Sequence, residues 1–194
     1  MQRIEELIYK EYNTIYENEE AKKQSRVNQL VMYYSYFVLY SFIGWIWETV
    51  VTSIDQGALQ NRGFLDIPLL PIYGFGVTFI IIFFYDKGIS LIRTFLGSAF
   101  ITAAMEFITS WVLEALFHRV WWDYSDMIFQ IQGRVCLLAT VTFGIISVLI
   151  VEILHPKIQK MVLNFIRYEK CKSLCVFSFT IILIDTIYKV IQLI

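Results

Sequence analysis

The chain has 194 residues, of which 57% are hydrophobic and 17% charged, and its formal net charge is −1. Soluble domains are about 45–50% apolar and about 25% charged. Residues 1–30 hold 11 of the 33 Asp, Glu, Lys and Arg residues, so the rest of the chain is still poorer in charge. The composition excludes an ordinary soluble domain. Three cysteines exclude a disulfide-stapled secreted domain, and the charge balance gives no indication of nucleic-acid binding. We therefore expect a polytopic membrane protein.

The first 30 residues predict a helix with an apolar stripe. Apolar side chains recur at helical spacing among charged residues, at Ile4, Leu7, Ile8, Tyr12, Ile15 and Tyr16. Such a helix lies on the membrane or packs on another subunit. A plain solvated helix explains the pattern equally well. The segment lacks the short basic-then-apolar pattern of a cleaved signal peptide.

Five windows are long and apolar enough to cross a bilayer, since a spanning helix needs about 20 predominantly apolar residues. They cover residues 31–54, 69–85, 92–117, 135–154 and 174–194. The predicted fold class is an all-α, polytopic transmembrane helical bundle of about five spans. The second window is the shortest, and its Pro and Gly residues predict an unwound start. If the last window lies in the interface, a four-span core remains.

The loops set the orientation, because Lys and Arg are enriched on the cytoplasmic side. With the N-terminus inside, 12 of the 16 basic residues fall on the inner side and four on the outer side. We therefore expect a multi-pass protein of the cell (plasma) membrane with a cytoplasmic N-terminus. Residues 1–30 form its cytoplasmic N-terminal segment. Residues 157–194 form a basic cytoplasmic segment followed by the last transmembrane helix.

The first and third windows resemble one another. Each has a Glu within its apolar part, Glu48 in one and Glu106 in the other, followed three or four residues later by Thr-Ser. Each is followed by an aromatic outer loop that contains Gly and Arg, and then by another span. This pattern predicts two parallel repeats of two helices about an axis along the membrane normal.

Ionisable residues inside a span are costly and usually face a bundle interior or a water-filled cavity. Glu48 and Glu106 are the strongest cases. Glu114 lies two turns beyond Glu106, and the same face of that helix also carries Ser110 and His118. One interpretation is the wall of a polar cavity for a substrate, a cation or a proton. The other is interhelical hydrogen bonding that holds the bundle together, which we favour for Glu114.

Two outer loops contain the remaining candidate residues. The stretch 61–76 is too apolar for a solvated loop and too rich in Pro and Gly for regular helix, so we expect a folded outer cap or a shallow re-entrant segment. In the second loop, the aromatic residues suit the interfacial belt, and Asp123 and Ser125 predict a cap or turn. The loop motif residues are Asn61, Gly63, Pro71, Tyr73, Gly74, Trp122, Tyr124 and Gly133.

Buried carboxylates need partners, and arginine offers a planar, bidentate one. We expect Arg62 and Arg134 to pair with Glu48, Glu106 or Asp123 across the outer half of the bundle.

Weaker signals complete the pattern. Asp185 and Lys189 are spaced to neutralise one another in the last span, and His155-Pro156 predicts the end of the fourth helix. No phosphate loop, nucleophile elbow or complete metal-ligand set is present, so we expect no catalytic residue, no cofactor and no metal.

Several motifs together resemble the bacterial putative ABC-transporter type IV permeases, the CmpB-like integral membrane proteins. In order, they are Tyr40-Ser41-Phe42-Ile43-Gly44-Trp45-Ile46-Trp47-Glu48, Asn61-Arg62-Gly63-Phe64-Leu65, Pro71-Ile72-Tyr73-Gly74-Phe75-Gly76, Trp122-Asp123-Tyr124-Ser125 and Gly133-Arg134-Val135-Cys136. The resemblance makes residues 31–156 a CmpB-like transmembrane core. It implies a permease that works with a separate ATPase subunit. The inner loop 86–93 is short for gripping an ATPase, whereas residues 1–30 and 155–173 offer a longer inner surface.

Three functions remain open from the sequence. The first is a transport component in which the intramembrane charges line a polar path. The second is a membrane enzyme acting on a lipid or isoprenoid headgroup, and the third is a scaffold or regulatory subunit. Enzymatic activity is the less favoured reading. The substrate is not encoded in any motif. The partners we expect are the lipid bilayer, the ATPase and, because the bundle is small, further copies of the chain.

Overall fold

The computed structural model describes residues 2–59, 63–168 and 170–194, with side chains described from residue 24 onward except at residue 55. The described residues form an all-α architecture, with one isolated antiparallel bridge between Ile131 and Val135. The elements in chain order are α1 (Gln2–Gln56), α2 (Pro71–Phe84), α3 (Leu91–Phe117), α4 (Leu137–Leu149), a π-helical turn η1 (Ile150–Leu154), α5 (His155–Ile166) and α6 (Cys171–Leu193). The all-α helical bundle expected from the sequence is confirmed.

Four helical stretches among the described residues are long and apolar enough to cross a membrane. They are Gln24–Ile54 within α1, α3, Leu137–Ile166 and α6. The remaining predicted span, the second window at residues 69–85, contains α2, whose 14 residues extend only about 21 Å. A bilayer core is about 30 Å thick. The helix begins directly at Pro71, which occupies the first turn where its missing N–H is tolerated. The expected unwinding therefore does not extend past that residue.

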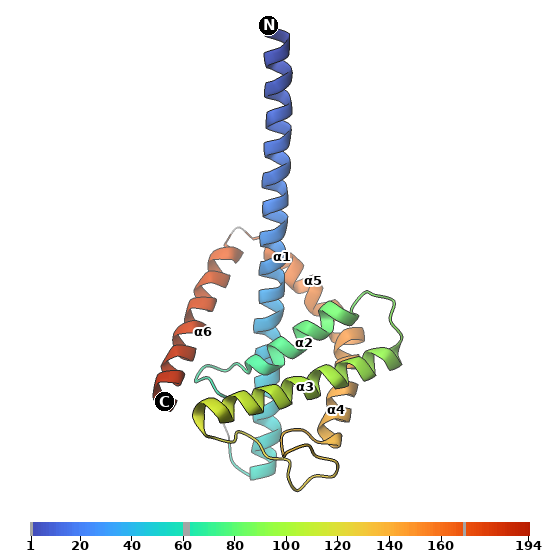
Figure 1. Cartoon of the computed structure of the whole chain (residues 1–194), viewed down its shortest axis with the longest axis vertical. Helices are drawn as coiled ribbons and strands as arrows, with labels where there is room; N and C mark the ends of the chain where they lie inside the picture. Colours follow the sequence, from blue (N-terminus) through green and yellow to red (C-terminus); the bar gives the residue numbers. More distant parts are fainter. Residues whose placement is uncertain (1, 60–62, 169) are drawn as a thin grey trace.

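The first span continues the N-terminal segment as one helix. Neither Pro nor Gly occurs between Gln2 and Ile43, so nothing in the sequence interrupts the backbone hydrogen bonds. Figure 1 shows the N-terminal half of α1 extending along the helix axis, clear of the other helices. The helix predicted for residues 1–30 is thus present over the described residues. Its position on the membrane, on another subunit or in solvent stays a prediction.

The helix predicted to end at His155-Pro156 continues through the proline. The stretch Leu137–Ile166 is one span in which α4 passes into η1 and then α5. A proline removes a backbone N–H and its ring clashes with the preceding turn. Here the π-helical turn lies immediately before Pro156 and changes the hydrogen-bond register there, which accommodates the ring without ending the helix.

Consecutive helices pack as two hairpins, α1 with α2 and α3 with α4. Gly44 and Gly74 let α1 and α2 approach closely. A Cβ atom at Gly44 would collide with the Tyr73 side chain, and one at Gly74 would collide with Ser41 and the Phe37 backbone oxygen. Small residues serve this purpose in membrane bundles, where dispersion contacts replace the hydrophobic effect between helices.

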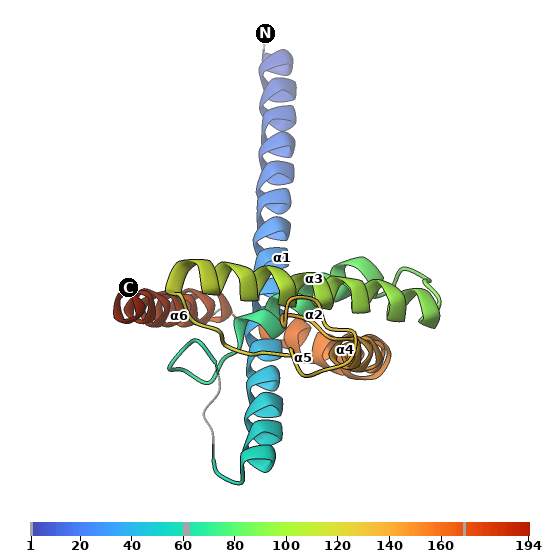
Figure 2. The same ribbon diagram turned by 60° about the horizontal axis from the view of Figure 1, so that its bottom comes forward.

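The two hairpins do not run parallel to one another. Figures 1 and 2 both show α3 lying across α1. The two helices therefore cannot both stand along the membrane normal.

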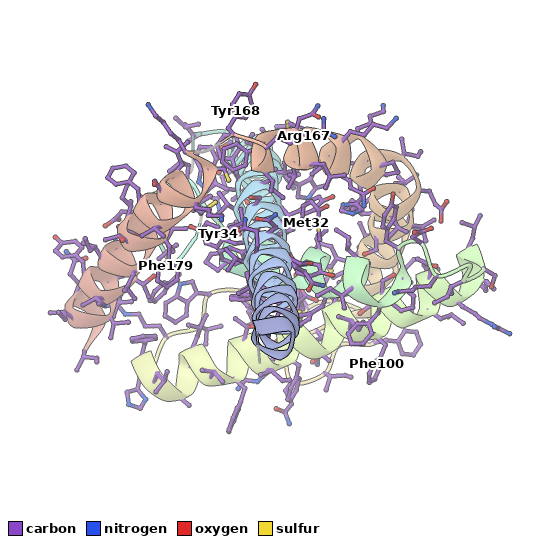
Figure 3. The ribbon with its side chains drawn as sticks, turned by 90° about the horizontal axis from the view of Figure 1, so that it is seen from above. Met32, Tyr34, Phe100, Arg167, Tyr168 and Phe179 are labelled. Carbon is purple, nitrogen blue, oxygen red and sulfur yellow. The ribbon has the colours of Figure 1, made fainter. Side chains whose placement is uncertain are left out.

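α6 lies at one side of α1, and most of its residues are at least partly exposed. The Tyr34 hydroxyl is 2.9 Å from the Ser178 hydroxyl, and the rings of Tyr34 and Phe179 meet edge to face at 6.2 Å. Figure 3 shows the Tyr34 and Phe179 side chains between the two helices. Along α6 only Cys171 is buried. An apolar helix this open suits contact with lipid.

The outer end of α6 binds the first outer loop. A salt bridge of 2.5 Å joins Lys189 to Asp66, and the Asp185 carboxylate accepts the backbone N–H of Asp66 at 3.0 Å. The expected pairing of Asp185 with Lys189 is therefore replaced by contacts of both residues with the loop. Leu65 and Leu70 of this loop are buried, so the loop is folded against the helices; whether it is an outer cap or a shallow re-entrant segment stays a prediction.

Candidate functional site

The first candidate residue, Glu48, lies on α1 beside the start of α2. The Tyr73 hydroxyl donates a 2.8 Å hydrogen bond to Glu48 Oε2. This contact depends on the close approach at Gly44, because the Tyr73 ring lies directly over that glycine. The backbone N–H of Leu70 also donates to the Ser41 carbonyl oxygen at 3.0 Å, which fixes the start of α2 on α1.

The second candidate, Glu106, is more deeply buried. Its exposed fraction is 8%, and the Tyr124 hydroxyl donates to Oε1 at 3.2 Å. The other oxygen, Oε2, is buried and has no hydrogen-bond partner among the described residues. A buried polar atom without a partner costs about 1–3 kcal/mol, so Glu106 retains an unused acceptor in the interior of the bundle.

The two glutamates have matching surroundings. Each lies on the first helix of a hairpin and accepts a tyrosine hydroxyl from the following segment of the same hairpin. Glu48 and Glu106 are also near enough to interact electrostatically. The structure thus brings together two carboxylates and two phenols, a group that can accept, donate or relay protons and can attract a cation.

The second outer loop holds Tyr124 in place. The Tyr124 backbone N–H donates to the Gly133 oxygen at 2.7 Å, and the Trp122 indole N–H donates to the Arg134 oxygen at 2.9 Å. Gly133 has φ +68, and a Cβ there would lie 2.5 Å from Asp123 Oδ1, so only glycine fits. Burial, followed by the Glu106 charge, raises the pKa of Tyr124, which keeps this hydroxyl protonated as a donor.

Asp123 forms the turn that the sequence predicts. Its Oδ1 accepts the Ser125 backbone N–H at 2.8 Å and the Ser125 hydroxyl at 2.5 Å. The Ser125 hydroxyl, and then its backbone N–H, lower the pKa of the exposed Asp123 carboxyl. The contribution of this turn to stability is therefore present at neutral pH and is lost as the pH falls through the lowered pKa.

Arg134 binds a different carboxylate from the three expected. It forms a salt bridge with Glu114 and donates from Nη1 to the Ser110 hydroxyl at 3.0 Å. Its guanidinium carbon also lies 6.0 Å from the centre of the Phe107 ring. The predicted polar stripe of α3 is thus a docking face for the loop that follows it, which agrees with the structural interpretation of Glu114. His118 ends α3 in a left-handed conformation and is exposed.

The first outer loop is described in part. Asn61 and Arg62 lie outside the described residues, so the pairing expected of Arg62 stays a prediction. Next to them, Phe64 packs against Phe117 and Trp121 at ring distances of 5.6 and 6.2 Å. These rings join the two outer loops.

Sequence reasoning missed a second polar cluster, between α1, the end of α2 and the start of α5. His155 is fully buried, its Nδ1 lies 2.9 Å from the Tyr40 hydroxyl, and the rings of Tyr36 and Tyr85 lie against it at 4.8 and 4.4 Å. The available signal was the four-residue spacing of Tyr36 and Tyr40 in an apolar window. His155 was interpreted only as part of a helix stop.

The comparisons with known proteins agree with this architecture. A family model described as putative ABC-transporter type IV, CmpB, matches residues 35–190. The match continues beyond the stretch that carries the sequence resemblance and includes most of α6. Comparison with curated proteins and with solved structures gave no significant match. The family match covers most of the chain, which therefore belongs to the putative ABC-transporter type IV family of multi-pass membrane proteins.

Proposed function

We propose that this chain is the membrane-embedded, permease-like subunit of a transporter whose ATPase is a separate protein. The observation that carries the proposal is Glu106, a carboxylate buried in a spanning helix with one oxygen that no described residue satisfies. Membrane proteins usually retain such groups where a substrate, ion or proton passes. The proposed polar path is also lined by Glu48, Tyr73 and Tyr124, which lie around Glu106.

The ATPase would bind at the inner side. The loop 85–90 between α2 and α3 is short, whereas the N-terminal half of α1 and the helix α5 present longer surfaces. The basic residues of these segments support a cytoplasmic location, because Lys and Arg are enriched there. We accordingly propose the bacterial plasma membrane, with a cytoplasmic N-terminus, and assembly with further copies of the chain.

The test is purification of the tagged, full-length chain from its native membrane in mild detergent. We expect an ATPase subunit to co-purify and the complex to hydrolyse ATP in nanodiscs. Glu106→Gln removes the charge and keeps the shape, so the complex should assemble but lose most of its ATP hydrolysis. Asp126→Asn, at an exposed loop residue, is the matched control. The proposal fails if no ATPase co-purifies, or if the Glu106 variant hydrolyses ATP as the parent does.

A scaffold or regulatory subunit is the second candidate. The observation that favours it is that each glutamate is bonded by a tyrosine of its own hairpin, as expected if the polar groups only hold the hairpins together. On this alternative, Glu48→Gln and Glu106→Gln variants fold and function as the parent does. Assay of both variants in the purified complex therefore distinguishes the two candidates.

A further inference from the structure

A small pocket lies between the middle of α1, the C-terminal end of α2 and the start of α5, away from the paired glutamates. Its volume is about 90 Å³, and its lining includes Tyr33, Tyr36, Tyr85, Lys87, His155 and Gln159. Met32 also lines it, and Figure 3 shows this residue on the opposite side of α1 from Tyr34. The pocket is thus separated from α6 by the body of α1.

Two buried polar groups of this lining have no hydrogen-bond partner among the described residues. They are His155 Nε2 and the Tyr36 hydroxyl, in side chains that are 0% and 1% exposed. Buried polar groups in native proteins are almost always satisfied. Two unsatisfied groups in the wall of a pocket therefore indicate that a bound ligand satisfies them.

The tautomer of His155 decides whether its free nitrogen donates or accepts. The Tyr40 hydroxyl lies 2.9 Å from His155 Nδ1. In the tautomer in which Tyr40 donates to Nδ1, the ring proton lies on Nε2, which is then a donor. An acceptor ligand selects this tautomer, and the Tyr36 hydroxyl has a hydrogen to donate in either one.

The other polar groups of the pocket also favour an acceptor ligand with negative charge. Gln159 accepts from the Tyr85 hydroxyl at 2.9 Å through its oxygen, which leaves its NH₂ group to donate. Lys87 is exposed and contributes a positive charge to the lining, which contains no Asp or Glu. Charge-assisted bonds from such donors are the strong ones for an oxyanion.

The volume of the pocket limits the size of the ligand. The volume of about 90 Å³ corresponds to about three water molecules at roughly 30 Å³ each. It admits a tetrahedral oxyanion but not a whole nucleotide or lipid. Lys87, in the loop after α2, is an exposed residue of the lining, so the group can arrive from that side, free or on a headgroup.

We propose that this pocket is a phosphate-binding site, in which Tyr36, His155, Gln159 and Lys87 bind either free phosphate or the phosphate of an inner-leaflet lipid. The site is independent of the proposed transport path. Its failure would leave the role of Glu106 untouched, and the reverse also holds. The π-helical turn directly before His155 is the local device that places the ring, as π-turns often do at functional sites.

The experiment uses the full chain in detergent and two probes. Equilibrium binding of radiolabelled inorganic phosphate tests the free ligand. Native mass spectrometry with phosphatidic acid and with diacylglycerol, which lacks only the phosphate, tests the headgroup. We expect binding of inorganic phosphate, or selective retention of phosphatidic acid over diacylglycerol. The probe that binds identifies the source.

The variants make the test specific to this pocket. Tyr36→Phe removes a hydroxyl that no described residue bonds, so the fold is kept and phosphate binding weakens about tenfold. Lys87→Gln, at an exposed position, should weaken binding similarly. Tyr168→Phe, at an exposed tyrosine of the turn after α5, is the control and should bind as the parent does. If neither probe binds, or if the Tyr36 and Lys87 variants bind as the parent does, the proposal is overturned and the pocket holds only water.

Discussion

At the scale of single residues, Arg134 connects the second outer loop to α3. Its side chain is 15% exposed, and that of its partner Glu114 is 42% exposed. Removing one member of a fully buried pair costs several kcal/mol, whereas a surface pair is worth little. The exposure of Glu114 places this pair between the two cases, and the bond to Ser110 adds to the contribution of Arg134.

We therefore expect Arg134→Gln to lower the free energy of unfolding by about 1–2 kcal/mol, measured as thermal melting of the purified chain in detergent. Glu114→Gln should have a smaller effect, because Arg134 then retains Ser110. The double variant should lose less than the sum of the two single variants. Equal melting of Arg134→Gln and the parent would show that the loop is held by its backbone bonds alone.

At the scale of elements, the close contact of α1 and α2 makes a clear prediction about glycine. Gly44→Ala places a methyl group into the Tyr73 ring, whereas a Cβ at Gly76 meets only Met105 Sδ at an ordinary 3.7 Å. We expect Gly44→Ala to destabilise the chain by about 1–3 kcal/mol and to displace the Tyr73 hydroxyl from Glu48. Gly76→Ala should be neutral or stabilising, since alanine favours helix. Melting curves of the two variants check this, and equal curves would contradict it.

The contact of α6 with the outer loop makes a second element-scale prediction. Asp185 accepts from the loop backbone, and Lys189 pairs with Asp66. Asp185→Ala should raise hydrogen exchange of the loop amides about tenfold or more while the other helices stay protected. Thr186→Ala, at a residue that bonds only its own helix at Ile182, is the control. Unchanged exchange in the Asp185 variant would mean that the buried leucines hold the loop without α6.

The elements also show how far sequence reasoning reaches. Apolar windows located the helices, and the cost of burying charge singled out Glu48 and Glu106, of which Glu106 is buried in the structure. The sequence could not predict their tyrosine partners, because the Tyr73 contact depends on how closely α1 and α2 approach at Gly44. The continuation of the helix through Pro156 was unpredictable for a similar reason. A π-helical turn is a tertiary adjustment that has no periodicity of its own.

For the whole molecule, the distribution of basic residues predicts the orientation. In a variant whose three cysteines are replaced by alanine, a single cysteine at Asp126 should react with a membrane-impermeant thiol reagent added to intact cells. A single cysteine at Ser173, after the inner basic loop, should react only after permeabilisation. Labelling in the opposite pattern would show that the topology is the reverse of the predicted one. The expected side of ATPase binding would then be reversed as well.

The length of α1 has a mechanical consequence. The stretch from Gln2 to residue 23 precedes the first span, Gln24–Ile54, in the same helix and extends about 33 Å at 1.5 Å per residue. It shares one axis with the part of α1 that carries Glu48. A tilt of the span by about 10° around its inner end would therefore move the far end of the helix sideways by about 6 Å. A small change in the tilt of the span thus becomes a larger displacement at the far end of α1.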